Sequence, residues 1–150
     1  MKRFLILIII FSLLSLTLFS IASLAAGSGS LYGKYLTVAD VEKAAGIKGV
    51  IRKEVALTLE FYNAKNEKIV EARFYGPEFY QEEVVKNQKY YTAVAGVGEK
   101  AAYTLSDMPY RLTFVKGKFG VMVQTPFASA KEPKNKEFLI AIGKVIAGRM

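Results

Sequence analysis

An uncharged apolar run at the N-terminus limits how much of this 150-residue chain can form a folded domain. Two basic residues precede the run, which covers residues 4–24 and is interrupted only by serine and threonine. A short basic region, an apolar stretch and small residues after it are typical of a secretory signal. We therefore expect residues 1–25 to be a signal peptide, residues 26–34 a flexible Gly- and Ser-rich linker, and residues 35–150 a single domain.

The same run also has the length of a membrane anchor. About 20 apolar helical residues cross the hydrocarbon core of a bilayer, and residues 4–24 carry no charge over that length. In both interpretations the positive charges of Lys2 and Arg3 stay in the cytoplasm. The sequence leaves a cleaved signal and a retained anchor open, and it predicts that the domain is exported, whether periplasmic, extracellular or anchored.

The chain contains no cysteine and no histidine. Without cysteine there is no disulfide, no thiolate chemistry and no lipidated cysteine, so an exported domain must be held together by its hydrophobic core. Without histidine, Ser-His-Asp catalysis and His-ligated zinc are excluded. We therefore expect a protein that is not an enzyme and that has no cofactor, no metal site and no catalytic residue.

Basic residues outnumber acidic ones by 21 to 13, which gives a formal net charge of +8. The lysines and arginines are scattered among glutamates and form no long run. Such a distribution is typical of a solvated surface with weak attraction to an anionic membrane surface. Nucleic acid is not an expected partner of an exported domain.

Local signals predict the helices and the first strands. Thr37 and Asp40 have the spacing of a capping box, and Gly46 follows as a helix end, which predicts a first helix between them. Apolar residues alternate over 54–62 and again over 69–75, which predicts two half-buried strands joined by a polar turn. Two further helices are expected after Pro77, over 78–87, and after Pro133.

The second half of the chain predicts more strands. Short strands are expected over 90–94 and 101–105, with a tight turn at 96–98 between them. The segment 111–124 is the clearest hairpin, because apolar residues alternate on both sides of a Lys-Gly-Lys turn. Together these elements predict an α+β fold: an antiparallel β-sheet of four to six strands, packed on one face by the N- and C-terminal helices.

Tyrosines and the last helix supply the candidate contact residues. Four tyrosines fall at strand ends or on the polar face of a strand, where tyrosine side chains often contact ligands or proteins. The last helix is apolar around most of its circumference, which favours an exposed partner face. The candidate partner or ligand contacts are Tyr62, Tyr75, Tyr90, Tyr91, Phe138, Ile142 and Ile146.

The order of these features resembles a group of small secreted bacterial envelope domains and lipoproteins of unknown function. The resemblance is carried by residues 36–41 with Gly46, by Val-Gly-Glu-Lys-Ala-Ala-Tyr at 97–103 ahead of the 111–124 hairpin, and by the C-terminal helix. It implies a helix-plus-antiparallel-sheet fold and an envelope location, and no catalytic residue. Members of the group often carry a lipidated cysteine and internal cysteines, which this chain lacks.

These observations favour an exported, non-enzymatic binding or interaction module of the cell envelope. Its partner is expected to be an unknown protein, or an apolar or anionic small ligand held against the sheet. The alternative is a membrane-tethered accessory subunit of an envelope complex, with residues 4–24 kept as a helix. A carboxylate-dependent hydrolase is the third hypothesis, and it requires at least two carboxylates to meet in one cleft. The candidates for that pair are Glu60, Glu71, Glu82, Glu83 and Asp107.

Overall fold

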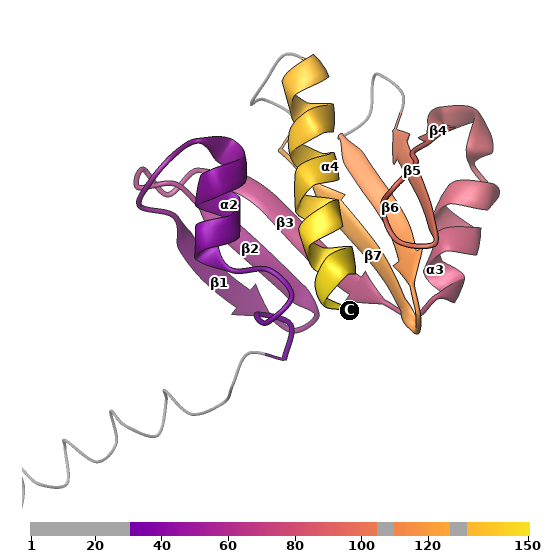
Figure 1. Cartoon of the computed structure of the whole chain (residues 1–150), viewed down its shortest axis with the longest axis horizontal. Coiled ribbons are helices and arrows are strands. Elements are labelled where there is room, and N and C mark those ends of the chain that lie inside the picture. The colour runs from indigo at the N-terminus through magenta and orange to yellow at the C-terminus, as the bar shows by residue number, and fades with distance from the viewer. Residues whose placement is uncertain (1–30, 105–109, 127–131) are drawn as a thin grey trace, which may run out of the picture. The chain divides into compact units, whose positions relative to one another are not determined.

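The computed structural model describes residues 31–104, 110–126 and 132–150. Within these ranges the chain forms a seven-stranded antiparallel sheet together with helices (Figure 1). The predicted α+β class and antiparallel sheet are therefore confirmed, whereas seven strands exceed the four to six predicted. The predicted signal or anchor, residues 1–25, lies outside the described residues.

The strand order is β1-β2-β3-β7-β6-β5-β4, so that β3 and β7, which are far apart in the sequence, pair in the middle of the sheet. The other pairs join strands that follow one another along the chain. The strands are β1 (Ile51–Val55), β2 (Thr58–Tyr62), β3 (Lys68–Tyr75), β4 (Tyr91–Ala93), β5 (Lys100–Thr104), β6 (Arg111–Lys116) and β7 (Phe119–Gln124).

The helical segments lie before, between and after these strands. The described helices are α2 (Val38–Ala45), α3 (Glu78–Tyr80) with the π-helical turn η1 (Gln81–Val85), the 3-10 turn η2 (Gln88–Tyr90) and α4 (Glu132–Arg149). α3 and η1 together occupy most of the predicted helix over 78–87. Figure 1 shows α2 and α4 on the same side of the sheet, and α3 at the far end from β1.

The predicted strand over 54–62 is wrong in its extent, because the structure divides it into two strands. β1 ends at Val55, and Ala56 adopts a positive φ of 51° in a two-residue turn before β2 begins. Phe61 is consequently buried while Val55 is exposed. The apolar alternation runs unbroken through the turn, so the pattern alone could not separate one long strand from two short ones.

Local interactions fix α2 as the sequence predicts. The Thr37 hydroxyl accepts from the Asp40 amide, and the Asp40 carboxylate accepts from the Thr37 amide at 2.8 Å, which completes the capping box. Gly46 ends the helix in the left-handed conformation, with φ of 68°. Arg149, near the end of α4, also binds the Asp40 carboxylate, at 2.6 Å, and so ties the first turn of α2 to the C-terminal helix.

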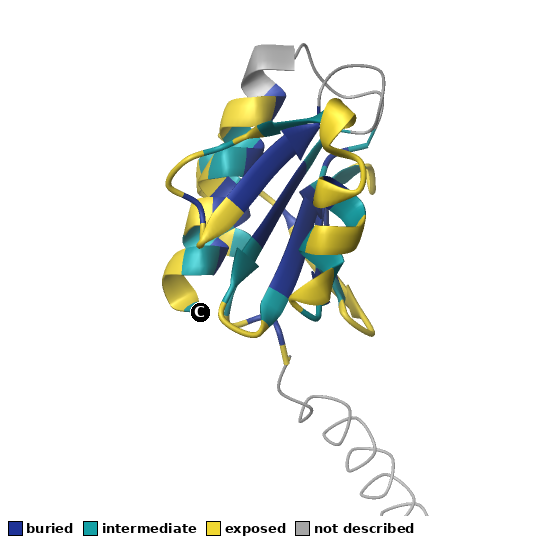
Figure 2. Ribbon diagram, turned by 90° about the vertical axis from the view of Figure 1, so that its right-hand side faces the viewer, coloured by how far each residue is buried: buried dark blue, intermediate teal, exposed yellow. Residues whose placement is uncertain are grey.

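The hydrophobic core lies between α4, α2 and one face of the sheet. Side chains that oppose one another in the register share a face, and the pairs Phe61↔Val70 and Phe114↔Val121 are fully buried. Figure 2 shows the buried strands in dark blue at the centre of the molecule. The buried helix residues of this cluster are Val41 from α2 and Leu139, Ile142 and Ile146 from α4.

The packed part of the chain begins before residue 35. Tyr32 lies in the range assigned to the linker, 26–34, yet it is buried and its ring stacks on Phe74 with the centroids 4.4 Å apart. The described residues from Leu31 to Met150 form one compact unit. Tyr32, although it lies in a Gly- and Ser-rich segment, is therefore part of the hydrophobic core and not of a linker.

The opposite face of the sheet is covered by α3 and η1 only in part. Phe79 of α3 stacks on Tyr75 with the centroids 3.9 Å apart. Glu83 of η1 binds Arg111 of β6 at 2.8 Å. Polar side chains of β2 and β3, among them Glu60 and Glu71, lie on another part of this outer face.

Candidate functional site

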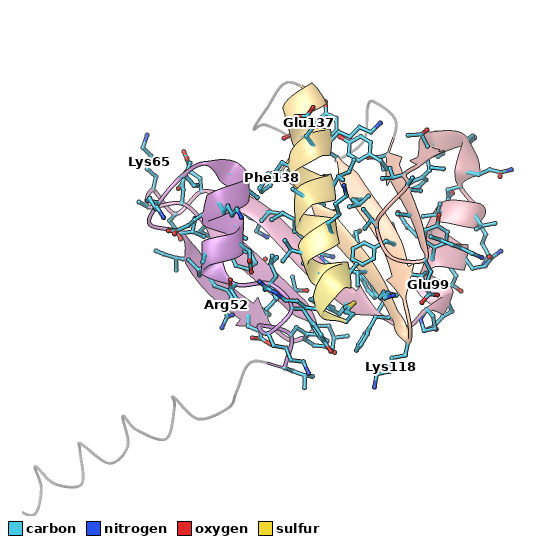
Figure 3. All side chains as sticks on the ribbon, in the orientation of Figure 1. Arg52, Lys65, Glu99, Lys118, Glu137 and Phe138 are labelled. Atoms are coloured by element: carbon cyan, nitrogen blue, oxygen red, sulfur yellow. The ribbon has the colours of Figure 1, made fainter. Side chains whose placement is uncertain are left out.

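A groove of about 1000 Å³ lies between α2, α4 and the turn that joins β2 to β3. Figure 3 shows Phe138 and Glu137 on the part of α4 that borders it. The apolar lining consists of Ala44, Ala45, Ile47, Ile69, Pro126, Phe138 and Ala141. The polar lining consists of Asn63, Glu67, Lys68, Thr125, Asn135 and Glu137.

The turn that forms one wall of the groove is fixed by the side chain of Asn63. Its Oδ1 accepts from the amides of Lys65 and Glu67 at 2.9 and 3.0 Å, and its Nδ2 donates to Glu67 Oε2 at 2.7 Å. An asparagine that bonds the backbone two residues ahead forms a stable Asx turn. Asn66 takes the positive φ of 60° that the turn needs, a conformation that asparagine tolerates. This wall is therefore preformed.

The opposite end of the groove contains buried polar groups. Thr125 is 3% exposed, and among the described residues its Oγ1 has no hydrogen-bond partner. Its backbone is held in place, since the Thr125 amide donates to the Tyr110 carbonyl at 3.2 Å. Asn135 of α4 is also buried. A few polar groups in a mainly apolar concavity are what small-molecule sites commonly present.

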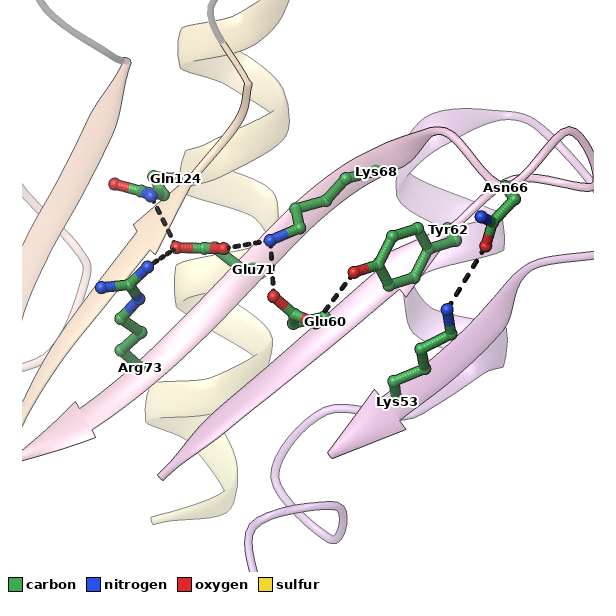
Figure 4. Close-up of polar contacts among 8 residues, drawn as sticks. All are labelled: Lys53, Glu60, Tyr62, Asn66, Lys68, Glu71, Arg73 and Gln124. Carbon is green, nitrogen blue, oxygen red and sulfur yellow. Dashed lines mark hydrogen bonds and ion pairs between the residues drawn. The ribbon is translucent and has the colours of Figure 1, made fainter. Parts of the chain in front are cut away.

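Glu71 is the centre of a charged network on the outer face of the sheet (Figure 4). It is 3% exposed, and its carboxylate binds Lys68 Nζ at 2.7 Å, Arg73 Nη2 at 2.6 Å and Gln124 Nε2 at 2.5 Å. Lys68 also binds Glu60, which faces Glu71 across β2 and β3. A buried carboxylate with three donors is fully compensated, so the network holds β2, β3 and β7 together.

The pKa shifts of Lys68 and Glu60 are those expected of side chains that stay charged and ion-paired near neutral pH. Burial alone would lower the pKa of Lys68, but hydrogen bonds to Glu60 and Glu71 outweigh it and raise that pKa to about 12. The hydrogen bond from Lys68 is also the main reason why the pKa of Glu60 is lowered. Both groups are charged near neutral pH, and the Lys68 ammonium is already committed to two carboxylates.

Three of the predicted tyrosines make internal contacts. Tyr62 donates to Glu60 at 2.8 Å, and Tyr75 stacks on Phe79. Tyr91 donates to Glu83 at 2.6 Å, and burial together with that bond raises its pKa. Tyr90 is exposed in η2, with Lys89 Nζ 4.7 Å from its ring centroid. None of the four lines the groove, so the structure disperses them over three strands and the 3-10 turn η2.

Of the three predicted contact residues on the last helix, two lie in the core and one lines the groove. Ile142 and Ile146 are fully buried in the core cluster, so they present no surface to a partner. Phe138 is half-buried and lines the groove. The helix is apolar around most of its circumference because one side meets the sheet and another forms the groove wall.

The carboxylates named for hydrolysis do not gather in the groove. Glu60 and Glu71 meet on the outer face, where Lys68 and Arg73 neutralise them. Glu82 and Glu83 lie on η1, and Glu83 is held by Arg111. Asp107 lies outside the described residues. The lowered pKa of Glu60 is the reverse of what a carboxylic acid catalyst needs.

The described residues contain neither a group of metal ligands nor a helix that could span a membrane. In residues 31–104, 110–126 and 132–150, no three His, Cys, Asp or Glu side chains are grouped as metal ligands would be. In the same part of the chain, no helix has the length and apolar character needed to cross a membrane.

Comparisons of the chain with protein-family models, with curated proteins and with solved structures find no match.

Most groove residues were not among the predicted site residues. Ala44 and Ala45, at the end of α2, are half-buried and line the groove. Ile47, after the helix end, forms part of the same lining. The signal that could have indicated them is the small apolar pair at the end of α2 followed by another apolar residue beyond Gly46.

Proposed function

We propose that this chain is an exported, non-enzymatic binding module that holds its ligand in the groove between α2 and α4. The observation that carries the proposal is the groove itself, with its apolar lining and a volume of about 1000 Å³. Ligand sites commonly have volumes of about 300–1,000 Å³ with mainly apolar walls and a few polar groups. Export is supported by the basic and apolar N-terminal segment, residues 1–25.

The lining favours an apolar ligand, either a small molecule or an apolar segment of a partner protein. Phe138, Ile47 and Ile69 supply large apolar side chains, and the alanines leave room between the helices. Burial of apolar ligand surface against such walls supplies about 25 cal/mol per Å². The affinity therefore comes mainly from the apolar body of the ligand.

The charges around the groove favour a neutral or cationic polar end on that ligand. Glu67 and Glu137 are exposed carboxylates of the lining. Among the described residues the lining contains one lysine, Lys68, and its ammonium is bound to Glu60 and Glu71. An anionic group would therefore meet the carboxylates of Glu67 and Glu137 with no other cation among the described lining residues, which is unfavourable.

A fluorescence titration of the full chain with N-phenyl-1-naphthylamine tests the proposal. This neutral dye brightens in apolar surroundings, and exciting it directly, outside the absorption of tryptophan, allows wild type and tryptophan variants to be compared. Ala141→Trp places a large ring in the groove, and we expect it to weaken dye binding about tenfold, equivalent to about 1.4 kcal/mol.

The matched control is Ala39→Trp. Ala39 is an exposed alanine of α2 that does not line the groove, so the same substitution there leaves dye affinity unchanged. Equal affinities of wild type, Ala141→Trp and Ala39→Trp would place the dye elsewhere on the chain and contradict the proposal.

A further inference from the structure

The outer edge of β1 is an exposed strand that has no neighbour in the described part of the chain. β1 stands at the end of the strand order, and all five of its residues are exposed. Ile51 and Val55 are 51% and 59% exposed, and Leu57 in the adjoining turn is 48% exposed. An edge strand with exposed apolar side chains is a template for pairing with another strand.

The register with β2 determines which backbone groups of β1 face outward. Val55 and Thr58 flank a two-residue turn, and this is the pair that closes a hairpin by exchanging hydrogen bonds. Backbone groups alternate along an antiparallel strand, so those of Lys53 point toward β2. The amides and carbonyls of Arg52 and Glu54 therefore point away from the sheet.

The sequence of β1 is complementary to itself when it is reversed. If a second copy pairs antiparallel with Lys53 opposite Lys53, Arg52 of each copy lies opposite Glu54 of the other. In the same register Ile51 lies opposite Val55. Opposite charges and apolar pairs directly across a strand pair are both stabilising, and twofold symmetry supplies each of them twice. This register also brings the outward backbone groups of the two copies together.

The lysine at the centre of this arrangement leans away from the free edge. Lys53 Nζ binds Asn66 Oδ1 at 3.3 Å and lies 4.3 Å from the ring centroid of Tyr62 on the neighbouring β2 (Figure 4). Both contacts draw the ammonium toward the interior of the sheet. The repulsion between two copies of Lys53 is thereby reduced.

We propose that two copies of this chain associate through β1, antiparallel and centred on Lys53, so that their sheets become continuous. The partner is a second copy because the strand carries both halves of each complementary pair. The interface is small, so the association is weak and depends on concentration. It uses the free edge of the sheet and leaves the groove between α2 and α4 open.

The absence of cysteine from the chain allows a direct crosslinking test. In the proposed register the two Lys53 Cα atoms lie about 4.5 Å apart, within the range that a disulfide spans. The full chain carrying Lys53→Cys is exposed to a mild oxidant, and covalent dimer is measured on a non-reducing gel. We expect dimer to form at least about tenfold faster than for Glu82→Cys, an exposed position on η1.

Charge reversal tests the register. In the Lys53→Cys chain, adding Glu54→Arg places arginine opposite arginine, and we expect crosslinking to slow about tenfold. Adding Arg52→Glu as well restores the opposite charges, and the rate should return. Circular dichroism of each variant checks that the fold is intact.

Two results would overturn the proposal. One is a Lys53→Cys rate no greater than that of Glu82→Cys. The other is a rate that Glu54→Arg leaves unchanged or that the charge-swapped chain fails to recover. If no dimer forms but the chain still binds the dye, the dimer proposal is wrong and the proposed function of the groove is unaffected.

Discussion

Gly98 lies in the loop between β4 and β5 and touches the backbone of β6. Its φ is 57°, and a Cβ built on it would stand 2.3 Å from the carbonyl oxygen of Val115. The next residue, Glu99, donates its amide to that same carbonyl at 2.8 Å. The loop is therefore held against β6 at a distance that only glycine permits.

Replacing Gly98 tests this close approach. We expect Gly98→Ala to lower the free energy of unfolding by about 2–4 kcal/mol, because positive-φ strain and a backbone clash act together. Urea denaturation of the full chain, followed by circular dichroism, measures the change.

The control for Gly98→Ala is Gly117→Ala in the β6–β7 turn. Gly117 has a similar φ of 55°, but a Cβ there meets nothing within 4 Å. It should cost about 1–2 kcal/mol from backbone strain alone. Equal losses for the two variants would show that the contact with Val115 is unimportant.

Asp40 gives the stability of the protein a dependence on acid pH. Burial opposes its ionisation, but hydrogen bonds with Arg149 and Thr37 outweigh burial and lower its pKa from the ordinary value of 3.8. A carboxyl whose folded pKa is lowered stabilises the protein above its unfolded pKa, and this contribution is lost as pH falls through the folded pKa.

The variant Asp40→Asn measures this contribution. At neutral pH we expect the variant to be about 1 kcal/mol less stable than wild type, because a cap and a partly exposed ion pair are both weakened. The difference should shrink as pH falls below about 4. Urea denaturation of both proteins from pH 7 to pH 3 would contradict this account if the difference stayed constant or grew.

The first hairpin shows what a strand pattern can and cannot predict. The alternation over 54–62 identified the extended conformation and the burial of Leu59 and Phe61 correctly. It missed the turn because Ala56 and Leu57 are not typical turn residues, and Ala56 takes a positive φ where glycine is usual. The extra strand of the sheet arises at this turn.

Glycine substitutions in the first two turns should change the stability of the protein in opposite directions. Ala56→Gly relieves positive-φ strain of about 1–2 kcal/mol and increases the freedom of the unfolded chain by a smaller amount, so we expect stabilisation of about 0.5–1 kcal/mol. Ala64→Gly, in the β2–β3 turn, has no such strain to relieve and should destabilise by about 0.5–1 kcal/mol. Thermal unfolding of both variants measures the signs, and destabilisation by Ala56→Gly would contradict the strain argument.

The ends of α2 were predictable to the residue because their determinants are local. The Thr37 and Asp40 capping box and the left-handed Gly46 involve residues within one or two turns of α2. The 111–124 hairpin was predictable for the same reason, since Gly117 and the alternating strands are neighbours in sequence. The burial of Ile142 and Ile146 could not be predicted in this way, because it depends on distant strands.

At the scale of the whole molecule, the β3–β7 pairing could not be predicted from the sequence. It joins segments such as Ala72 and Val123 that are far apart along the chain, and nothing local specifies their register. The groove depends on the same long-range arrangement, because Ala44, Ile69 and Phe138 come from three separate segments. The sequence indicated Phe138 as a candidate apolar contact, but nothing in it indicated that Ala44 and Ile69 line the same groove.

The two faces of the sheet have different roles in this account. On the outer face, Glu71 is compensated by Lys68, Arg73 and Gln124, which leaves its carboxylate bound on both oxygens. On the inner face, α2 and α4 stay apart over part of their length and leave apolar side chains around the groove. We propose that the molecule holds its ligand in this inner groove.

The most direct test uses NMR. The isotopically labelled full chain is titrated with N-phenyl-1-naphthylamine, and the change in each amide chemical shift is measured. We expect Ala141→Trp to suppress the largest changes, which should fall on the groove residues Ala44, Ala45, Ile47, Ile69 and Phe138. If these amides do not shift and the changes fall instead on residues 4–24 or around Tyr90, the proposed groove site is contradicted.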